Sequence, residues 1–248
     1  MPSLSRRLRS LAILVIAVVA LVVWVLTDAS GSQPLTTPQS ITRAMPSAEY
    51  EWPDTGPSVD FSYVHPTVAH YSADIPRKAR VLDLGCGNGA MTASFLDRGW
   101  ELVCVDTSQS GLALARRRWP QIRFEYGDVT GDLSRLGTFD AILSTEVVEH
   151  LFLPQHFARN AYRLLKPGGM LVLSTPYHGW LKNVAIAVTN GADAHYQPLN
   201  ERGHIKFWSV STLSQLLWEA GFTDLEYTGA GRIPYLWKTM VMRARKPR

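Results

Sequence analysis

Short apolar runs alternate with amphipathic stretches from about residue 80 to the end of the chain. Seven runs have the length and composition of buried β-strands: 81–84, 101–105, 122–126, 139–144, 170–174, 223–228 and 235–244. Helical patterns lie between most of them, at 90–96, 108–118, 151–165 and 211–220. Strands that alternate with helices predict an α/β fold with a doubly wound, mostly parallel sheet.

The first 27 residues have a different composition. Arg6, Arg7 and Arg9 precede sixteen apolar residues at 11–26, and no acidic residue occurs before or within this run. Its length is at the lower limit of a membrane span and also fits the core of a signal peptide. We expect an uncleaved single-pass anchor over 1–27. A cleaved signal, an organellar presequence or a misassigned start are the alternatives.

The residues after this run predict a linker and one domain. Residues 28–58 are rich in Ser, Thr, Pro and Gly, which is typical of a linker. The remaining 59–248 would form the domain, with 178–207 as an insert after the fifth strand. No basic residue follows the apolar run until Arg43, so the positive-inside rule places the N-terminus in the cytoplasm and the domain across the membrane.

The charge and the cysteine content argue against a nucleic-acid-binding protein and against a zinc protein. The net charge of the 248-residue chain is +4, and basic residues at the two termini account for it, so it does not indicate a nucleic-acid-binding surface. Cys86 and Cys104 are the only cysteines and have no CxxC spacing, which argues against a zinc site. We expect two reduced thiols.

A glycine-rich turn follows the first predicted strand. The segment from Asp83 to Gly89 reads DLGCGNG, and the alternate glycines Gly85, Gly87 and Gly89 allow a sharp turn that a ligand can approach closely. The N-terminus of the next helix offers N–H groups to an anion. The second strand ends in Asp106, at the distance where a carboxylate can bind ribose hydroxyls.

This turn, together with Asp106, resembles the first two motifs of the class I S-adenosylmethionine-dependent methyltransferases, and the resemblance runs from about residue 60 to the C-terminus. It implies a Rossmann-like, seven-stranded sheet with an antiparallel last strand, and S-adenosyl-L-methionine as the cofactor. It also implies that Asp128 binds the adenine amino group, although turn chemistry would equally explain this aspartate. A helix at 60–74 would be a lid over the cofactor or a packing helix. The cofactor-binding residues expected are Asp83, Gly85, Cys86, Gly87, Gly89, Asp106, Thr107, Asp128, Val129 and Thr145.

A cluster of titratable residues follows the fourth strand. In a helix, Glu146, Glu149 and His150 would share one face because they stand at positions i, i+3 and i+4. Two carboxylates and an imidazole can bind a divalent metal. Alternatively, His150 acts as a general base without a metal, or packs beneath the cofactor.

The STEVVEH sequence around this cluster resembles a motif of the ubiquinone-pathway O-methyltransferases and of the small-RNA 2′-O-methyltransferases. In those families the glutamates and the histidine bind a divalent metal, and in the RNA enzymes a histidine heading a His-x-Lys-Phe segment completes the site. The resemblance therefore implies Glu146, Glu149, His150 and His204 as ligands of Mg²⁺ or Mn²⁺. No RNA-binding domain accompanies these motifs, and the insert matches neither family.

The insert follows a strand carboxyl end and is expected to cover the cofactor as a substrate cap. Tyr177, Trp180 and Trp208 are candidates for a substrate wall, although burial in an aromatic core is the simpler expectation for each. Lys182 and Lys206 are expected at the solvated surface.

Together these patterns predict an enzyme that transfers a methyl group to an oxygen by direct displacement, with Glu149 and His150 as catalytic residues. We expect a lipid-like or quinol acceptor first, then another small hydroxylated molecule or a glycan, and regard nucleic acid as unlikely. The alternatives are a membrane-tethered protein that binds adenosylmethionine without catalysis, and methyl transfer to carbon or nitrogen. A domain across the membrane would be separated from cytosolic adenosylmethionine, which conflicts with the orientation that the positive-inside rule predicts.

Overall fold

The structure, a computed structural model, describes residues 50–248. The predicted anchor and most of the predicted linker lie outside the described residues. Within 50–248, no helix is both long and apolar enough to cross a membrane.

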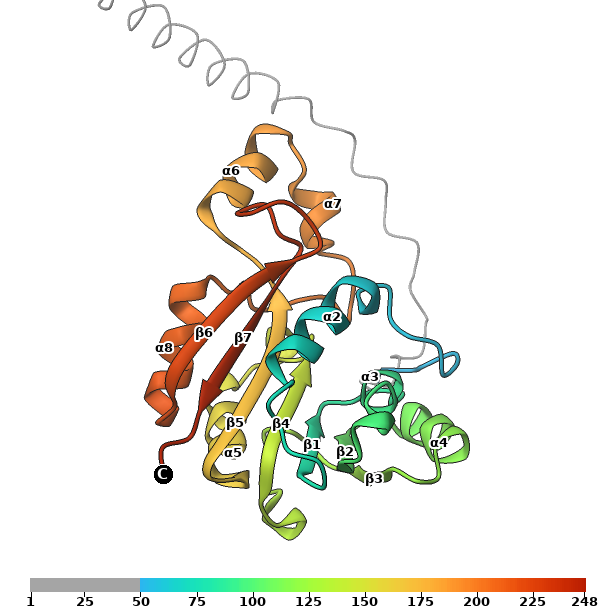
Figure 1. The fold of residues 1–248 in the computed structure, drawn as a ribbon. Helices are drawn as coiled ribbons and strands as arrows, with labels where there is room; N and C mark the ends of the chain where they lie inside the picture. The colour runs from blue at the N-terminus through green and yellow to red at the C-terminus, as the bar shows by residue number, and fades with distance from the viewer. Residues whose placement is uncertain (1–49) are drawn as a thin grey trace, which may run out of the picture. The chain divides into compact units, whose positions relative to one another are not determined.

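Seven strands form one mixed sheet in the order β3-β2-β1-β4-β5-β7-β6 (Figure 1). The strands are β1 (Arg80–Leu84), β2 (Glu101–Asp106), β3 (Arg123–Tyr126), β4 (Phe139–Thr145), β5 (Leu165–Pro176), β6 (Thr223–Ala230) and β7 (Thr239–Arg245). The first five are parallel, and β7 runs antiparallel to both β5 and β6. The predicted fold is therefore confirmed, including the antiparallel last strand. Chain order reverses between β1 and β4, the position where open α/β sheets bind ligands.

The helices of this region are α2 (Phe61–Tyr71), α3 (Ala90–Ala93), α4 (Gln109–Arg118), α5 (Pro154–Leu164), α6 (Trp180–Val188), α7 (Ala192–Tyr196) and α8 (Val210–Ala220). Two predictions of local structure were wrong. The helix expected at 90–96 ends after Ala93, where the Ser94 hydroxyl donates to the Met91 carbonyl at 2.7 Å and competes with helix hydrogen bonds. The strand expected at 170–174 is longer, because β5 runs from Leu165 to Pro176.

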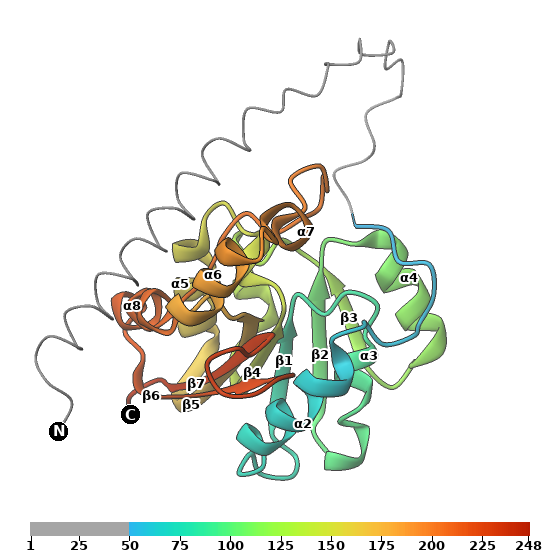
Figure 2. The same cartoon turned by 90° about the horizontal axis from the view of Figure 1, so that it is seen from above.

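The sheet separates two hydrophobic cores because successive residues of a strand face opposite sides. On β1, Leu82 and Leu84 pack with α5 and α8, while Val81 packs with α2 and α4. Figure 2 shows α5 and α8 on one side of the sheet and α2 on the other. Through Val64 and Val68, α2 joins the second core and contacts β5, β6 and β7. These contacts support a packing helix rather than a lid.

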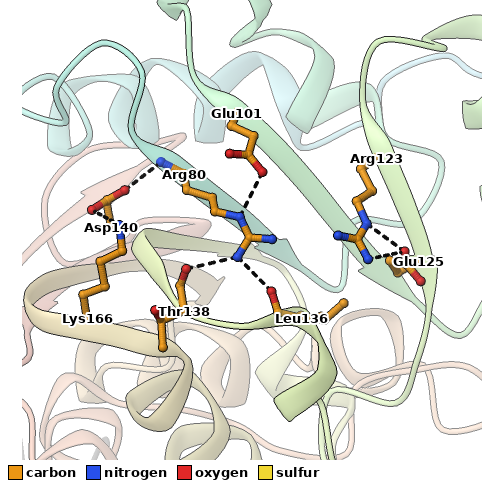
Figure 3. Close-up of polar contacts among 8 residues, drawn as sticks. All are labelled: Arg80, Glu101, Arg123, Glu125, Leu136, Thr138, Asp140 and Lys166. Carbon is orange, nitrogen blue, oxygen red and sulfur yellow. Dashed lines mark hydrogen bonds and ion pairs between the residues drawn. The ribbon is translucent and has the colours of Figure 1, made fainter.

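Polar contacts close the edge of the sheet where the parallel strands begin (Figure 3). The Arg80 guanidinium donates to Glu101 at 2.9 Å and to the carbonyl of Leu136 at 2.8 Å. The Arg80 main-chain amide donates to the Asp140 carboxylate at 2.8 Å. These contacts tie β1, β2 and β4 together at one edge, and the predicted site residues lie at the opposite edge.

Candidate active site

The glycine turn after β1 has the left-handed backbone that its sequence predicts. Gly85, Gly87 and Gly89 have φ values of 90°, 56° and 78°, which side chains with a Cβ adopt rarely. The Gly85 amide donates to the Val105 carbonyl at 2.9 Å, and the Gly87 amide donates to the Asp106 carboxylate at 2.7 Å. The turn is thus fixed to the end of β2.

Asp106 organises the loops around the predicted cofactor site. Besides the Gly87 amide, its carboxylate accepts the Ser108 amide at 2.7 Å. The Ser108 hydroxyl in turn accepts the Gly111 amide at 3.1 Å and caps α4. Thr107 is exposed beside Asp106. The carboxylate therefore connects the glycine turn to the start of α4.

The other predicted cofactor residues divide between the sheet edge and the interior. Asp128 is exposed after β3 and accepts the Thr130 amide at 2.7 Å, while Val129 is buried. Thr145 ends β4 at the same edge. Asp83, in contrast, is 1% exposed and accepts the Thr92 hydroxyl at 2.5 Å. Burial raises the Asp83 pKa to about 7, and the side chain connects β1 to α3.

Cys86 and Cys104 form a disulfide, with 5.8 Å between their α-carbons. The expectation of two reduced thiols was wrong. In the pairing of β1 with β2, Asp83 lies opposite Cys104, so the glycine turn that follows β1 brings Cys86 back over this residue. The disulfide is a second link between the glycine turn and β2.

The segment Tyr50–Gly56, hereafter the strap, lies against the glycine turn, which its linker-like composition did not indicate. The Asn88 side chain, 2% exposed, donates to the carbonyl oxygens of Asp54 at 3.0 Å and Gly56 at 2.7 Å. The Ser108 hydroxyl donates to the Tyr50 carbonyl at 2.5 Å. Asn88 is part of the glycine turn and Ser108 follows Asp106, so both anchoring residues belong to the loops that are expected to bind the cofactor.

The Trp52 ring of the strap also lies against this turn. A Cβ added at Gly87 would collide with the Trp52 ring, and one added at Gly111 would lie 2.7 Å from that ring. The Trp52 amide donates to the Ser110 hydroxyl at 3.2 Å. The glycine at 87 is therefore required in this structure by the close approach of an aromatic ring.

The segment after β4 is not the predicted α-helix. Glu146 has a φ of 54°, and only a single 3-10 turn, Val148–His150, follows. The Glu146 carboxylate accepts the Ser174 hydroxyl at 2.7 Å on β5. Helical spacing therefore does not place Glu146 with Glu149 and His150. The left-handed residue turns its side chain toward β5 instead.

Glu149, His150 and His204 nevertheless come together. One potential ligand atom from each lies within 4.8 Å of the other two. The main-chain carbonyl of Glu149 accepts the amides of Ile205 and Lys206, both at 2.9 Å, which holds the C-terminal part of the insert against the 3-10 turn. Three of the four predicted metal ligands are thus adjacent, and Glu146 is not among them.

The environment of this cluster favours neutral imidazoles beside carboxyl groups that ionise with difficulty. Burial, and then the neighbouring Glu146, raise the Glu149 pKa well above its ordinary value. Burial also raises the Glu146 pKa to about 7. Burial followed by the charge on His150 lowers the His204 pKa to about 4, and burial lowers the His150 pKa. A cation or a proton would relieve the two buried carboxyl groups.

The insert carries α6 and α7 above the carboxyl ends of β4 and β5 (Figure 1). Tyr177 and Trp208 are buried, as expected for aromatic core residues, but Trp180 is 75% exposed. Lys182, expected in solvent, is 6% exposed, so that prediction was wrong. Lys206 is partly buried.

A separate cavity of about 580 Å³ lies between α5 and the loop after β3. Residues including Arg159, Asn160 and Arg163 line it, and none of the predicted site residues does. It is distinct from the candidate active site.

Comparison with known proteins identifies the domain. Residues 60–227 match the family described as a methyltransferase domain. The ubiquinone biosynthesis O-methyltransferase of Ruegeria pomeroyi is 32% identical over 165 residues, which cover 64% of this chain and 66% of that protein. The protein of the same name from Cereibacter sphaeroides (strain ATCC 17025) is 31% identical over 173 residues, covering 67% and 69%.

Solved structures show the same fold. A putative methyltransferase from Bacillus halodurans aligns with a TM-score of 0.59 at 19% identity, covering 75% of this chain and 99% of that one. The 1,6-didemethyltoxoflavin-N1-methyltransferase of Burkholderia thailandensis, solved with its substrate and S-adenosylhomocysteine, gives 0.56 at 23% identity, covering 74% and 77%.

Proposed function

Because the chain belongs to the class I S-adenosylmethionine-dependent methyltransferases, we propose that it methylates a hydroxyl oxygen of a small, lipid-like or quinol-type acceptor. The observation that carries this proposal is the cluster of Glu149, His150 and His204 at the sheet edge that also holds the glycine turn and Asp106. The names of the O-methyltransferases from Ruegeria and Cereibacter support oxygen as the methyl-accepting atom.

The cluster fits a divalent cation. Glu149 Oε1 is buried and has no hydrogen-bond partner among residues 50–248, and an orphaned carboxylate oxygen is costly unless a cation or a proton binds it. Glu149, His150 and His204 would hold the ion, which would lower the pKa of an acceptor hydroxyl when bound. One carboxylate and two imidazoles suit Mn²⁺ better than Mg²⁺, because Mg²⁺ prefers oxygen ligands.

The chain's own residues then orient the reactants and accept a proton. The sulfonium of the cofactor already activates the methyl group, so the main requirement is to hold the acceptor oxygen in line with it. His150 Nδ1 lies 3.3 Å from the Gly203 carbonyl oxygen, which can only accept. The hydrogen is therefore on Nδ1, and Nε2 has a free lone pair that can serve as a ligand or as a base.

An apolar acceptor is supported by the surface of the insert. The side chains of Trp180 and Val188 on α6 are 75% and 72% exposed, and those of Ile233 and Tyr235 in the β6–β7 loop are 67% and 58% exposed. Exposed apolar side chains grouped on two neighbouring segments are typical of binding surfaces. Together with the predicted anchor at 1–27, they favour a membrane-associated protein that takes its acceptor from the lipid phase.

Product analysis tests the proposal. The full chain is incubated with adenosylmethionine carrying a trideuteromethyl group and with a membrane lipid extract, and labelled products are fragmented by mass spectrometry. We expect label in a methoxy group. Label only on nitrogen or carbon would contradict the proposal.

A further inference from the structure

Helix α6 buries a lysine and exposes most of its large apolar residues. Of its nine residues, Lys182 alone is buried, at 6% exposure, whereas Trp180 is 75% and Val188 is 72% exposed. A surface helix ordinarily packs through an apolar stripe and leaves lysine in water. The orientation of α6 therefore directs an ammonium group into the protein, which is costly unless that group is paired.

The Lys182 ammonium has little compensation from the protein. Its Nζ donates to the Lys238 carbonyl at 3.3 Å, although an ammonium has three hydrogens to donate. None of the ion pairs found within residues 50–248 includes Lys182. Burial and then the charge of Arg232 lower its pKa to about 8, and Glu146 opposes this shift. The lysine thus lies within electrostatic reach of the carboxyl groups below the insert.

The titratable groups around the candidate active site fall into two sets. The sheet edge provides carboxyl groups, namely Glu146 and Glu149. The insert and the β6–β7 loop provide Lys182, Arg232 and imidazoles, including His178, whose ring centroid lies 5.2 Å from that of His195. Lys182 also contributes to the lowered pKa of His204, so this cation lies within electrostatic reach of the cluster of Glu149, His150 and His204.

We propose that Lys182 forms a subsite for an anionic oxygen of the acceptor, in a carboxylate or a phosphate group, while the hydroxyl to be methylated lies over Glu149, His150 and His204. This inference rests on the proposed O-methyl transfer and narrows its substrate class to hydroxylated acids. Ligand binding would complete the pairing that Lys182 lacks, and an ammonium–anion hydrogen bond is stronger than a neutral one.

The test uses three probes that differ in one group: catechol, 3,4-dihydroxybenzoate and 3,4-dihydroxyphenylphosphonate. Calorimetry measures their affinity for the full chain in detergent, saturated with S-adenosylhomocysteine. We expect at least one acidic probe to bind about tenfold or more tightly than catechol, as a charged hydrogen bond implies. Which acid binds better distinguishes a carboxylate from a phosphate ligand.

The variants Lys182→Met and Lys182→Arg separate charge from shape. Lys182→Met should lower the affinity for the acidic probe to that for catechol and leave catechol binding unchanged, whereas Lys182→Arg should retain most of the preference. Lys166→Met is the matched control, because Lys166 pairs with Asp140 at 2.8 Å at the opposite edge of the sheet (Figure 3). Thermal melting of each variant verifies that it is folded.

Two results would overturn the inference. The first is a wild-type protein that binds the acidic probes no more tightly than catechol, or that binds no probe. The second is a folded Lys182→Met variant that still prefers the acidic probes. Methyl transfer to the bound probes is measured in parallel. An acidic probe that binds through Lys182 but receives no methyl group would count against the proposed O-methylation and leave the anion subsite standing.

Discussion

The Gly87 main-chain amide donates a hydrogen bond of 2.7 Å to the Asp106 carboxylate. The two residues belong to the two motifs expected to bind adenosylmethionine, and this contact makes Asp106 a structural part of the glycine turn. A change at Asp106 should therefore affect the cofactor site in two ways: through the loss of a ligand group and through the release of the turn.

We predict that Asp106→Ala weakens adenosylhomocysteine binding more than Asp106→Asn does. The asparagine keeps one acceptor oxygen, which can bind the Gly87 or the Ser108 amide. Alanine leaves both amides without an acceptor, and each unsatisfied amide costs about 1–3 kcal/mol of stability. Calorimetry gives the affinities, and urea unfolding gives the stabilities. Equal losses in the two variants would show that the carboxylate does not organise the turn.

The strap should be released when Asn88 is shortened. Asn88→Ala removes the two hydrogen bonds to Asp54 and Gly56, each worth about 1 kcal/mol. Amide hydrogen exchange of the strap should therefore become faster by about tenfold or more.

Asn160→Ala is a matched control for Asn88→Ala. The Asn160 side chain makes the same pair of contacts elsewhere, to the carbonyl oxygens of Val129 and Gly131 at 2.9 and 2.6 Å. This variant should leave exchange in the strap unchanged. Similar exchange of the strap in wild type and Asn88→Ala would show that other contacts hold it.

Asp83 should make stability fall as pH rises. Its pKa is about 7 when folded and about 3.8 when unfolded, so between these values the folded state binds more protons and loses stability with increasing pH. Asp83→Asn removes this dependence. The free energies of unfolding of the two proteins should diverge from pH 4 upward, in favour of the Asp83→Asn variant, by about 4 kcal/mol at pH 8. A constant difference from pH 4 to 8 would contradict the raised pKa.

The disulfide between Cys86 and Cys104 should make both cysteines resistant to alkylation until the protein is reduced. Alkylation of the unfolded, unreduced protein should modify neither cysteine, and reduction should expose both. Cys104→Ser should lower the free energy of unfolding by about 3 kcal/mol, the value for a loop of this size. Two alkylated cysteines before reduction would show that the thiols are free in the purified protein.

Much of the fold could be predicted because strand burial and glycine turns are local properties of the sequence. The run from Val81 to Leu84 is apolar except for Asp83 because both faces of β1 are covered, and Gly85, Gly87 and Gly89 have the backbone that their spacing implies. The position of Asp106 at the end of β2 follows from the same alternation of strands and helices.

The features that were missed depend on tertiary contacts or on single backbone angles. Glu146 leaves the expected helical face because its φ is 54°, which a sequence pattern does not indicate for glutamate. Cys86 meets Cys104 only through the register of β1 and β2. Lys182 is buried because it lies, with the partly buried Ala185 and Ile186, on the side of α6 that faces the protein, and composition alone predicts the opposite.

The central claim is that Glu149, His150 and His204 act together in methyl transfer, apart from cofactor binding. His204 tests it most directly, since it comes from the C-terminal part of the insert, while Asp106 and the glycine turn lie elsewhere. The measurement compares His204→Ala with wild type, each with and without EDTA, in transfer of the labelled methyl group and in affinity for adenosylhomocysteine. We predict that the substitution and EDTA each reduce methyl transfer about a hundredfold or more, and that their effects do not add, as for residues that act as a unit. The affinity for adenosylhomocysteine should change less than about threefold. Full transfer by His204→Ala in the presence of EDTA would contradict the account.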